Sequence, residues 1–188
     1  LALSPDGRHA IVADPTMDRV WFLNLANGDA LELAGRKCSS AAFSPDGSFF
    51  ALGGHNQSWL CSTESRAPIA PPLPQRSWVA QVGFSPNGRW LATLSRKTGV
   101  RLWDAATGEP PSHELAHPEV ISFAFSPDSR RLVSSGQDQF VRLWEVPSGR
   151  LLAENRLAAW RCAFSPDGRR VVVGRGRARD ALVLNAAS

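Results

Sequence analysis

The chain has 188 residues, 43% of them hydrophobic and 20% charged, a composition typical of a folded domain and not of a disordered segment. No apolar run approaches the ~20 residues that a membrane helix needs, so no spanning helix is expected. The net charge is +4, with nineteen Arg and two Lys, which permits an anionic partner without demanding a nucleic acid. Cys38, Cys61 and Cys162 lack the paired spacing of a disulfide framework or a zinc site, so we expect buried free thiols in a reducing compartment.

A short turn motif recurs five times along the chain. It begins at Ser4, Ser44, Ser85, Ser126 and Ser165, at spacings of 40, 41, 41 and 39 residues. Three copies are Ser-Pro-Asp-Gly, the third is Ser-Pro-Asn-Gly and the fourth is Ser-Pro-Asp-Ser. Pro presets the backbone and Asp-Gly tolerates a tight bend, so each copy predicts a hairpin turn. A second landmark follows each turn, clearest as Leu-Trp-Asp at 102–104 and Leu-Trp-Glu at 143–145, and the linked pair predicts a repeat architecture.

The first four repeats each predict four short strands and the fifth stops after its third strand; the pattern is clearest in the fourth unit. There we expect strands at 120–125, 131–135, 140–145 and 150–154. The second and third strands carry apolar residues on both faces, which indicates sheets stacked against neighbouring sheets. The units span about 1–34, 35–75, 76–116, 117–155 and 156–188 of a single domain.

An all-β chain of ~40-residue units with four strands each matches the blades of a β-propeller. On these turns and on the dipeptide Trp103-Asp104, the chain resembles the WD-repeat β-propeller family over essentially its whole length. The repeated Phe-Ser-Pro-Asp-Gly form resembles bacterial members, which often sit beside kinase or nucleotide-hydrolase domains. The family commonly has seven blades, so we expect an incomplete arc of about five blades, with Ser188 near a natural end and Leu1 at a truncation. A closed ring of five blades is the alternative.

Residues 113–117 spell His-Glu-Leu-Ala-His, the pattern of zinc metalloproteases. That chemistry requires a helix, which places both His side chains on one face with the Glu beside the metal-bound water. Pro110, Pro111 and Pro118 leave too few residues for a stable helix, and the repeat places the segment on an outer strand. We therefore expect no metal and no other cofactor.

The fourth unit also contains His117, Ser134 and Asp138, the residue types of a nucleophilic triad. Ser134 lies in the middle of a predicted strand, without the flanking glycines of a nucleophile elbow, so we expect no catalytic residue. The resemblance implies instead a structural network, in which the Trp144 indole bonds Ser134, Ser134 bonds His117 and His117 bonds Asp138. The third unit keeps the hydroxyl and the indole but carries other residues in place of the His and the Asp, namely Arg76 and Lys97.

The resemblance implies a non-catalytic, cytoplasmic scaffold for a protein or peptide partner. Partners of this family commonly dock where the first strands begin and where the second-to-third turns lie. By repeat register, the candidate residues there are Lys37, Ser39, His55, Trp78, Ala80, Arg96, Glu119, Ile121, Gln137, Trp160, Arg177 and Arg179. Trp78 and Trp160 are the strongest of these, because Trp is enriched at interface hot spots, although either could instead fill space between blades.

Other functions stay open at this point. The basic stretch 169–180 could hold a phosphate or an acidic peptide, or could be a solvated turn, and an Arg-rich surface could bind RNA or another polyanion. A regulatory module within a larger signalling protein is a further alternative. A propeller enzyme would need polar clusters on the first strands, where the residues are small or apolar, as at Ala41, Val82 and Ala124.

Overall fold

The computed structural model describes residues 1–14, 19–33, 38–110, 114–175 and 180–186, and in these ranges every regular element is a β-strand. No helix within them is long and apolar enough to cross a membrane. The strands form five antiparallel sheets, each built from consecutive strands. The predicted all-β class is confirmed.

The five sheets follow chain order. The first contains β1 (Ala2–Leu3), β2 (His9–Asp14), β3 (Arg19–Asn24) and β4 (Ala30–Glu32). The second contains β5 (Ser40–Phe43), β6 (Phe49–Gly53), β7 (Gln57–Ser62) and β8 (Leu73–Pro74). The third contains β9 (Val79–Phe84), β10 (Trp90–Ser95) and β11 (Gly99–Asp104). The fourth contains β12 (Val120–Phe125), β13 (Arg131–Gly136), β14 (Phe140–Glu145) and β15 (Leu151–Arg156). The fifth contains β16 (Arg161–Phe164), β17 (Arg170–Arg175) and β18 (Asp180–Asn185).

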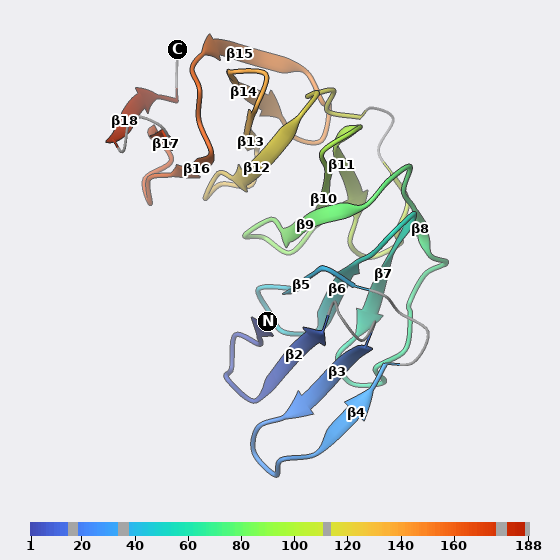
Figure 1. Ribbon diagram of the computed structural model, residues 1–188. Helices are drawn as coiled ribbons and strands as arrows, with labels where there is room; N and C mark the ends of the chain where they lie inside the picture. Colours follow the sequence, from blue (N-terminus) through green and yellow to red (C-terminus); the bar gives the residue numbers. More distant parts are fainter. Residues whose placement is uncertain (15–18, 34–37, 111–113, 176–179, 187–188) are drawn as a thin grey trace.

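The sheets follow one another along an open arc (Figure 1). The first strands of successive sheets contact one another on the concave side, β1 with β5, β5 with β9, β9 with β12 and β12 with β16. In the four-stranded sheets the last strands, β4, β8 and β15, lie on the convex side. The first and fifth sheets lie at opposite ends, so this is an arc of propeller blades and the five sheets do not close into a ring.

The hydrophobic core is divided into layers between successive sheets. The strand β10 shows how one strand serves two layers. Its residues Trp90, Ala92 and Leu94 pack with Phe123 of the fourth sheet, whereas Leu91 packs in the layer shared with the second sheet. Every residue of β10 is buried, which explains why its sequence does not alternate between apolar and polar residues. At ~1.5–3 kcal/mol for each large side chain, this burial dominates the stability of the stack.

The five recurrent turns share one hydrogen-bond pattern. In each, the Ser hydroxyl donates to the Asp or Asn side chain at 2.5–2.7 Å, and the backbone N–H five residues after the Ser donates to the hydroxyl at 2.8–3.0 Å. The Ser hydroxyl is the main cause of a lowered pKa in the four turn aspartates, Asp6, Asp46, Asp128 and Asp167. The fourth turn position has a positive φ, 69° at Gly7 and 61° at Ser129, which explains the preference for Gly.

Polar contacts also join successive sheets. The backbone N–H of Asn87 donates to Ser129 Oγ at 3.0 Å, which links the turns of the third and fourth sheets. On the concave side, Ser39 Oγ donates to Val79 O at 2.5 Å and Val82 N–H donates to Ser40 Oγ at 3.0 Å. Neighbouring sheets are thus held by hydrogen bonds as well as by apolar packing.

Candidate functional site

The arc has two edges that carry the connections between strands. We call the edge that carries the Ser-Pro-Asp-Gly turns the SPDG edge. The other edge, at which each first strand begins, is called the opposite edge. The residues directly before β5, β9, β12 and β16 hold equivalent places on the opposite edge and are Ser39, Trp78, Glu119 and Trp160. All four are exposed. Because the strands are antiparallel, the turns between second and third strands lie at this edge as well.

A pocket of about 620 Å³ opens at the opposite edge between the fourth and fifth sheets. Glu119 and Ile121 line it from the start of β12, and Gln137 lines it from the turn between β13 and β14. Trp160 and Arg175 line it from the fifth sheet, and the Trp160 side chain is 54% exposed. Four candidate residues from two sheets, Glu119, Ile121, Gln137 and Trp160, therefore surround one opening.

The other candidates that the structure describes do not line this pocket. Trp78 is 45% exposed and meets His55 of the second sheet edge to face, with 6.0 Å between ring centroids. Arg96 adjoins the pocket through its backbone, because its carbonyl accepts from Glu119 N–H at 3.1 Å. Three candidates fall outside the described residues, namely Lys37, Arg177 and Arg179.

Two charged residues line the pocket: Arg175 has an ion-pair partner, and Glu119 has none among the described residues. Arg175 Nε donates to Asp180 Oδ1 at 2.8 Å, and a second nitrogen of Arg175 contacts Asp180 Oδ2. This bidentate contact lowers the pKa of Asp180 and raises that of Arg175, so both groups stay charged. Glu119 has no ion pair within the part of the chain that the structure describes. Its carboxylate is therefore available to a ligand.

A buried network joins several segments of the fourth sheet on the face that packs against the third sheet. Trp144 Nε1 donates to Ser134 Oγ at 2.8 Å, and Ser134 Oγ lies 2.6 Å from His117 Nδ1. His117 Nε2 lies 3.1 Å from Asp138 Oδ1, and Arg142 Nη1 donates to Asp138 Oδ2 at 2.5 Å. A carboxylate only accepts, so Nε2 of His117 carries the proton, Nδ1 accepts, and the Ser134 hydroxyl donates to it. Every polar group of the network then has a partner.

The protonation states follow from burial. Burial is the main cause of a lowered pKa for His117, although Asp138 opposes the shift, so the imidazole is neutral near pH 7. Burial alone would raise the pKa of Asp138, but hydrogen bonds from Arg142, the Phe140 backbone and His117 lower it overall. Ser134 and His117 are both 0% exposed, and the Trp144 indole already occupies the Ser134 oxygen. A substrate therefore has no access to this serine, despite its triad-like partners.

Gly136 is the residue that adjoins both the network and the pocket. It lines the pocket, and a Cβ added to it would lie 2.6 Å from His117 Nε2 and 2.7 Å from Asp138 Oδ1. His117 also stands two residues before Glu119, and Asp138 directly follows Gln137. The network thus fixes the backbone that presents two of the pocket residues.

The third sheet contains a shorter version of this network. Repeat register placed Arg76 at the position of the histidine, and that assignment is wrong. Trp103 Nε1 donates to Thr93 Oγ1 at 3.0 Å, and Gln75 Nε2 donates to the same oxygen at 3.1 Å. Gln75 therefore takes the place of the histidine, whereas Arg76 is exposed. Gln75 and Thr93 are 18 residues apart but His117 and Ser134 are 17 apart, so counting back from the turn selects the neighbouring residue.

The His-Glu-Leu-Ala-His segment is not helical where it is described. Leu115 and Val100 exchange backbone hydrogen bonds of 2.9 and 3.2 Å, which extends the third sheet outward. Glu114 pairs with Arg101 Nε at 3.0 Å, and His117 belongs to the buried network. His113 falls outside the described residues, and the described ones contain no cluster of three or more His, Cys, Asp or Glu suited to a metal.

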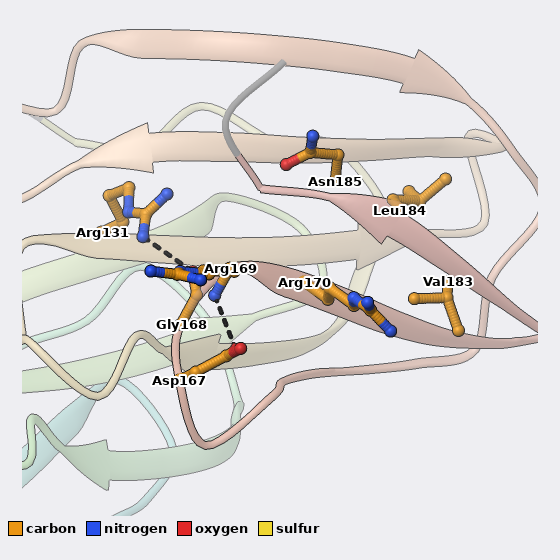
Figure 2. Close-up of a pocket in the computed structure, with 8 residues that line it drawn as sticks. All are labelled: Arg131, Asp167, Gly168, Arg169, Arg170, Val183, Leu184 and Asn185. Carbon is orange, nitrogen blue, oxygen red and sulfur yellow. Dashed lines mark hydrogen bonds between the residues drawn. The ribbon is translucent and has the colours of Figure 1, made fainter.

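A second pocket, of about 680 Å³, lies at the SPDG edge of the fifth sheet. Figure 2 shows Arg131 and Arg169 beside the turn at Asp167 and Gly168, with Val183 farther along the pocket. Arg131 donates to Gly168 O at 2.8 Å and to Ala186 O at 2.7 Å. Its guanidinium therefore joins the fourth sheet to the fifth, a role that no sequence motif indicates.

The basic stretch 169–180 is divided between the two edges. The strand β17 runs from Arg170, at the SPDG edge, to Arg175 at the opposite edge, and residues 176–179 fall outside the described ranges. Within β17, Val171 and Val173 are buried whereas Val172 is 39% exposed. The described part of the stretch is therefore a strand of the sheet and not one continuous basic patch.

An open arc of stacked antiparallel sheets, with a pocket between two of them, defines a β-propeller-type protein. The family described as WD domain, G-beta repeat matches residues 73–104 and 109–145. These two matches lie in the third and fourth units and support a WD-repeat family, whose members generally serve as scaffolds for protein interactions and not as enzymes. Comparison with the sequences of curated proteins gave no match.

Proposed function

We propose that this chain is a non-catalytic interaction module that binds a protein or peptide partner in the pocket beside Trp160. The observation that carries the proposal is the joint position of Glu119, Ile121, Gln137 and Trp160 around one opening of about 620 Å³. Ligand pockets commonly have volumes of ~300–1,000 Å³. A half-exposed indole beside an aliphatic side chain offers the large, partly apolar anchor on which interface hot spots depend.

A catalytic role has less support from the described residues. The hydroxyl and imidazole that resemble a triad are fully buried and do not line the pocket. Burial also raises the pKa of Cys162, and it raises the pKa of Cys38 to about 11, so neither thiol supplies a nucleophile at neutral pH. All three cysteines are buried, and Cys38 and Cys162 are free thiols, which fits a reducing compartment, and we propose a cytoplasmic location.

The test is a selection of random short peptides, displayed on phage, against the full chain. We expect Trp160→Ala to weaken the selected peptides about tenfold or more, the usual cost of truncating a hot-spot residue. Trp78→Ala is the matched control, because it removes an indole from the equivalent exposed position in the third sheet. Thermal unfolding of both variants shows whether they remain folded.

Two results would contradict this assignment. If the selected peptides bind Trp160→Ala as well as they bind the parent chain, the pocket is not the binding site. If only Trp78→Ala abolishes binding, the site lies instead at the contact between His55 and Trp78.

A further inference from the structure

The opposite edge carries an excess of basic side chains that have no acidic partner. Arg96 and Lys97 lie in the turn between β10 and β11, Arg156 ends β15 and Arg161 begins β16. All four are exposed, and within the described ranges none of them forms an ion pair. Among the described residues, four cations without an ion pair therefore lie on this edge in the third to fifth sheets.

The carboxylates of the same region are mostly occupied. Asp138 and Glu154 share Arg142, with His117 also bonded to Asp138, and Asp180 is held by Arg175. Glu119 is the one carboxylate that lines the pocket, and it has no ion pair among the described residues. The uncompensated charge around the pocket is therefore positive.

None of these four side chains lines the pocket, but three of the residues are close to its lining residues through the backbone. Arg96 lies beside it, because its carbonyl accepts from Glu119 N–H at 3.1 Å. Arg156 precedes Leu157, whose N–H donates at 2.7 Å to the carbonyl of Gln139, another lining residue. Arg161 directly follows Trp160. The backbone thus places a basic residue of the third, the fourth and the fifth sheet close to the opening.

We infer that the partner segment is an acidic peptide that places an apolar side chain against Trp160 and Ile121. This inference rests on the proposed function and specifies the chemistry of the partner. Carboxylates of the peptide meet Arg96, Arg156 and Arg161, whose planar guanidinium groups suit bidentate contacts with carboxylates. Complementary charge also speeds association and discriminates against basic partners.

A peptide fits this pocket better than RNA does. Ile121 and the half-exposed Trp160 give it an apolar wall that accepts an aliphatic or aromatic side chain. The free carboxylate of Glu119 repels a phosphate, but it can accept hydrogen bonds from the N–H groups of a peptide backbone. Glu119 also repels the acidic side chains of the peptide, so these lie toward the arginines and away from Glu119, and it is the apolar wall that favours a peptide over RNA.

The experiment uses the peptides selected on the full chain and measures their affinity by fluorescence anisotropy. We expect enrichment of peptides that combine Glu or Asp with a large apolar residue. Arg161→Glu should weaken their binding about tenfold or more, because it replaces an attraction beside the pocket with a repulsion. Arg130→Glu changes the net charge equally at an exposed residue of the SPDG edge, and should weaken binding less than about twofold at moderate salt, where distant charges are screened.

Three outcomes would overturn the inference while leaving the proposed function intact. In the first, the selected peptides are neutral or basic but still need Trp160. In the second, Arg130→Glu weakens binding as much as Arg161→Glu, so that only the net charge matters. In the third, a polyuridylate oligonucleotide binds the chain more tightly than the selected peptides and displaces them. Peptides that bind independently of Trp160 would instead refute the proposed function itself.

Discussion

The variant Ser134→Ala tests the buried network most directly. Ser134 is fully buried, and its hydroxyl accepts from Trp144 Nε1 at 2.8 Å and donates to His117 Nδ1 at 2.6 Å. The substitution leaves an indole donor and an imidazole acceptor unpaired in the core, where each unpaired group costs ~1–3 kcal/mol. We therefore expect the free energy of unfolding to fall by about 2–4 kcal/mol, measured by urea unfolding followed through Trp fluorescence and circular dichroism.

Ser95→Ala provides the control for this measurement. Ser95 lies on the second strand of the third sheet, is 2% exposed and has a hydroxyl without a hydrogen-bond partner in the described structure. Its loss should change the free energy of unfolding by less than about 1 kcal/mol and can even stabilise the chain, because a buried unpaired polar group is removed. Equal effects of Ser134→Ala and Ser95→Ala would show that the network contributes nothing beyond burial of the hydroxyl.

Three further predictions concern Gln75, His117 and Cys38. Gln75→Leu should lower the free energy of unfolding, measured by urea unfolding, by about 1–3 kcal/mol, because it removes the amide that bonds the buried hydroxyl of Thr93. The control is Arg76→Ala at the neighbouring exposed residue, which should change the free energy of unfolding by less than about 0.5 kcal/mol. The pKa of His117 is lower in the folded than in the unfolded chain, so the unfolded chain binds more protons and stability falls as the pH drops below the ordinary histidine pKa of ~6.5. His117→Gln should remove this pH dependence of the urea midpoint, and an unchanged slope would contradict the assignment. Alkylation by iodoacetamide at pH 8 should be far slower for Cys38 in the native chain than in urea, because burial raises the pKa of its thiol to about 11, and equal rates would show that the thiol is accessible.

The local parts of the fold could be predicted from the sequence because their cause is local. In the fourth turn, Ser126 Oγ donates to Asp128 Oδ1 at 2.6 Å and accepts from Arg131 N–H at 2.9 Å, so one short motif closes the hairpin. The third turn has Asn87 in place of the Asp, and its side-chain oxygen accepts the same hydrogen bond from the serine. Five such motifs fix where each first strand ends and where each second strand begins.

The register between turns could be predicted less well, because it depends on contacts between sheets. Gln75 takes its place through a backbone hydrogen bond of 2.8 Å to Asn56 O in the second sheet, and counting within the third unit does not reveal that bond. Arg130 and Arg131 are adjacent basic residues with the same appearance in the sequence. The stacking of the fourth sheet on the fifth is what turns Arg131 toward the carbonyls of Gly168 and Ala186.

The candidate site could likewise be predicted only in part from the sequence. Repeat register placed Glu119 and Trp160 at equivalent positions in their own sheets, and the structure agrees, since each directly precedes the first strand of its sheet. Register alone does not say that these two residues enclose one opening whereas Trp78 meets His55 instead. That difference depends on how each sheet packs against the next, which the period of the repeat does not specify.

The two edges of the arc differ in a way that bears on where a partner can bind. At the SPDG edge each sheet makes the same hydrogen bonds, with a Ser donating to an Asp or Asn, so that edge offers little to distinguish one sheet from another. At the opposite edge the equivalent positions carry Ser39, Trp78, Glu119 and Trp160, which differ in size, polarity and charge. A partner that binds at one place on a repetitive protein must contact residues that differ between repeats. The structural demands of the repeat are met at the SPDG edge, and the opposite edge is therefore where a partner can distinguish the fourth and fifth sheets from the others.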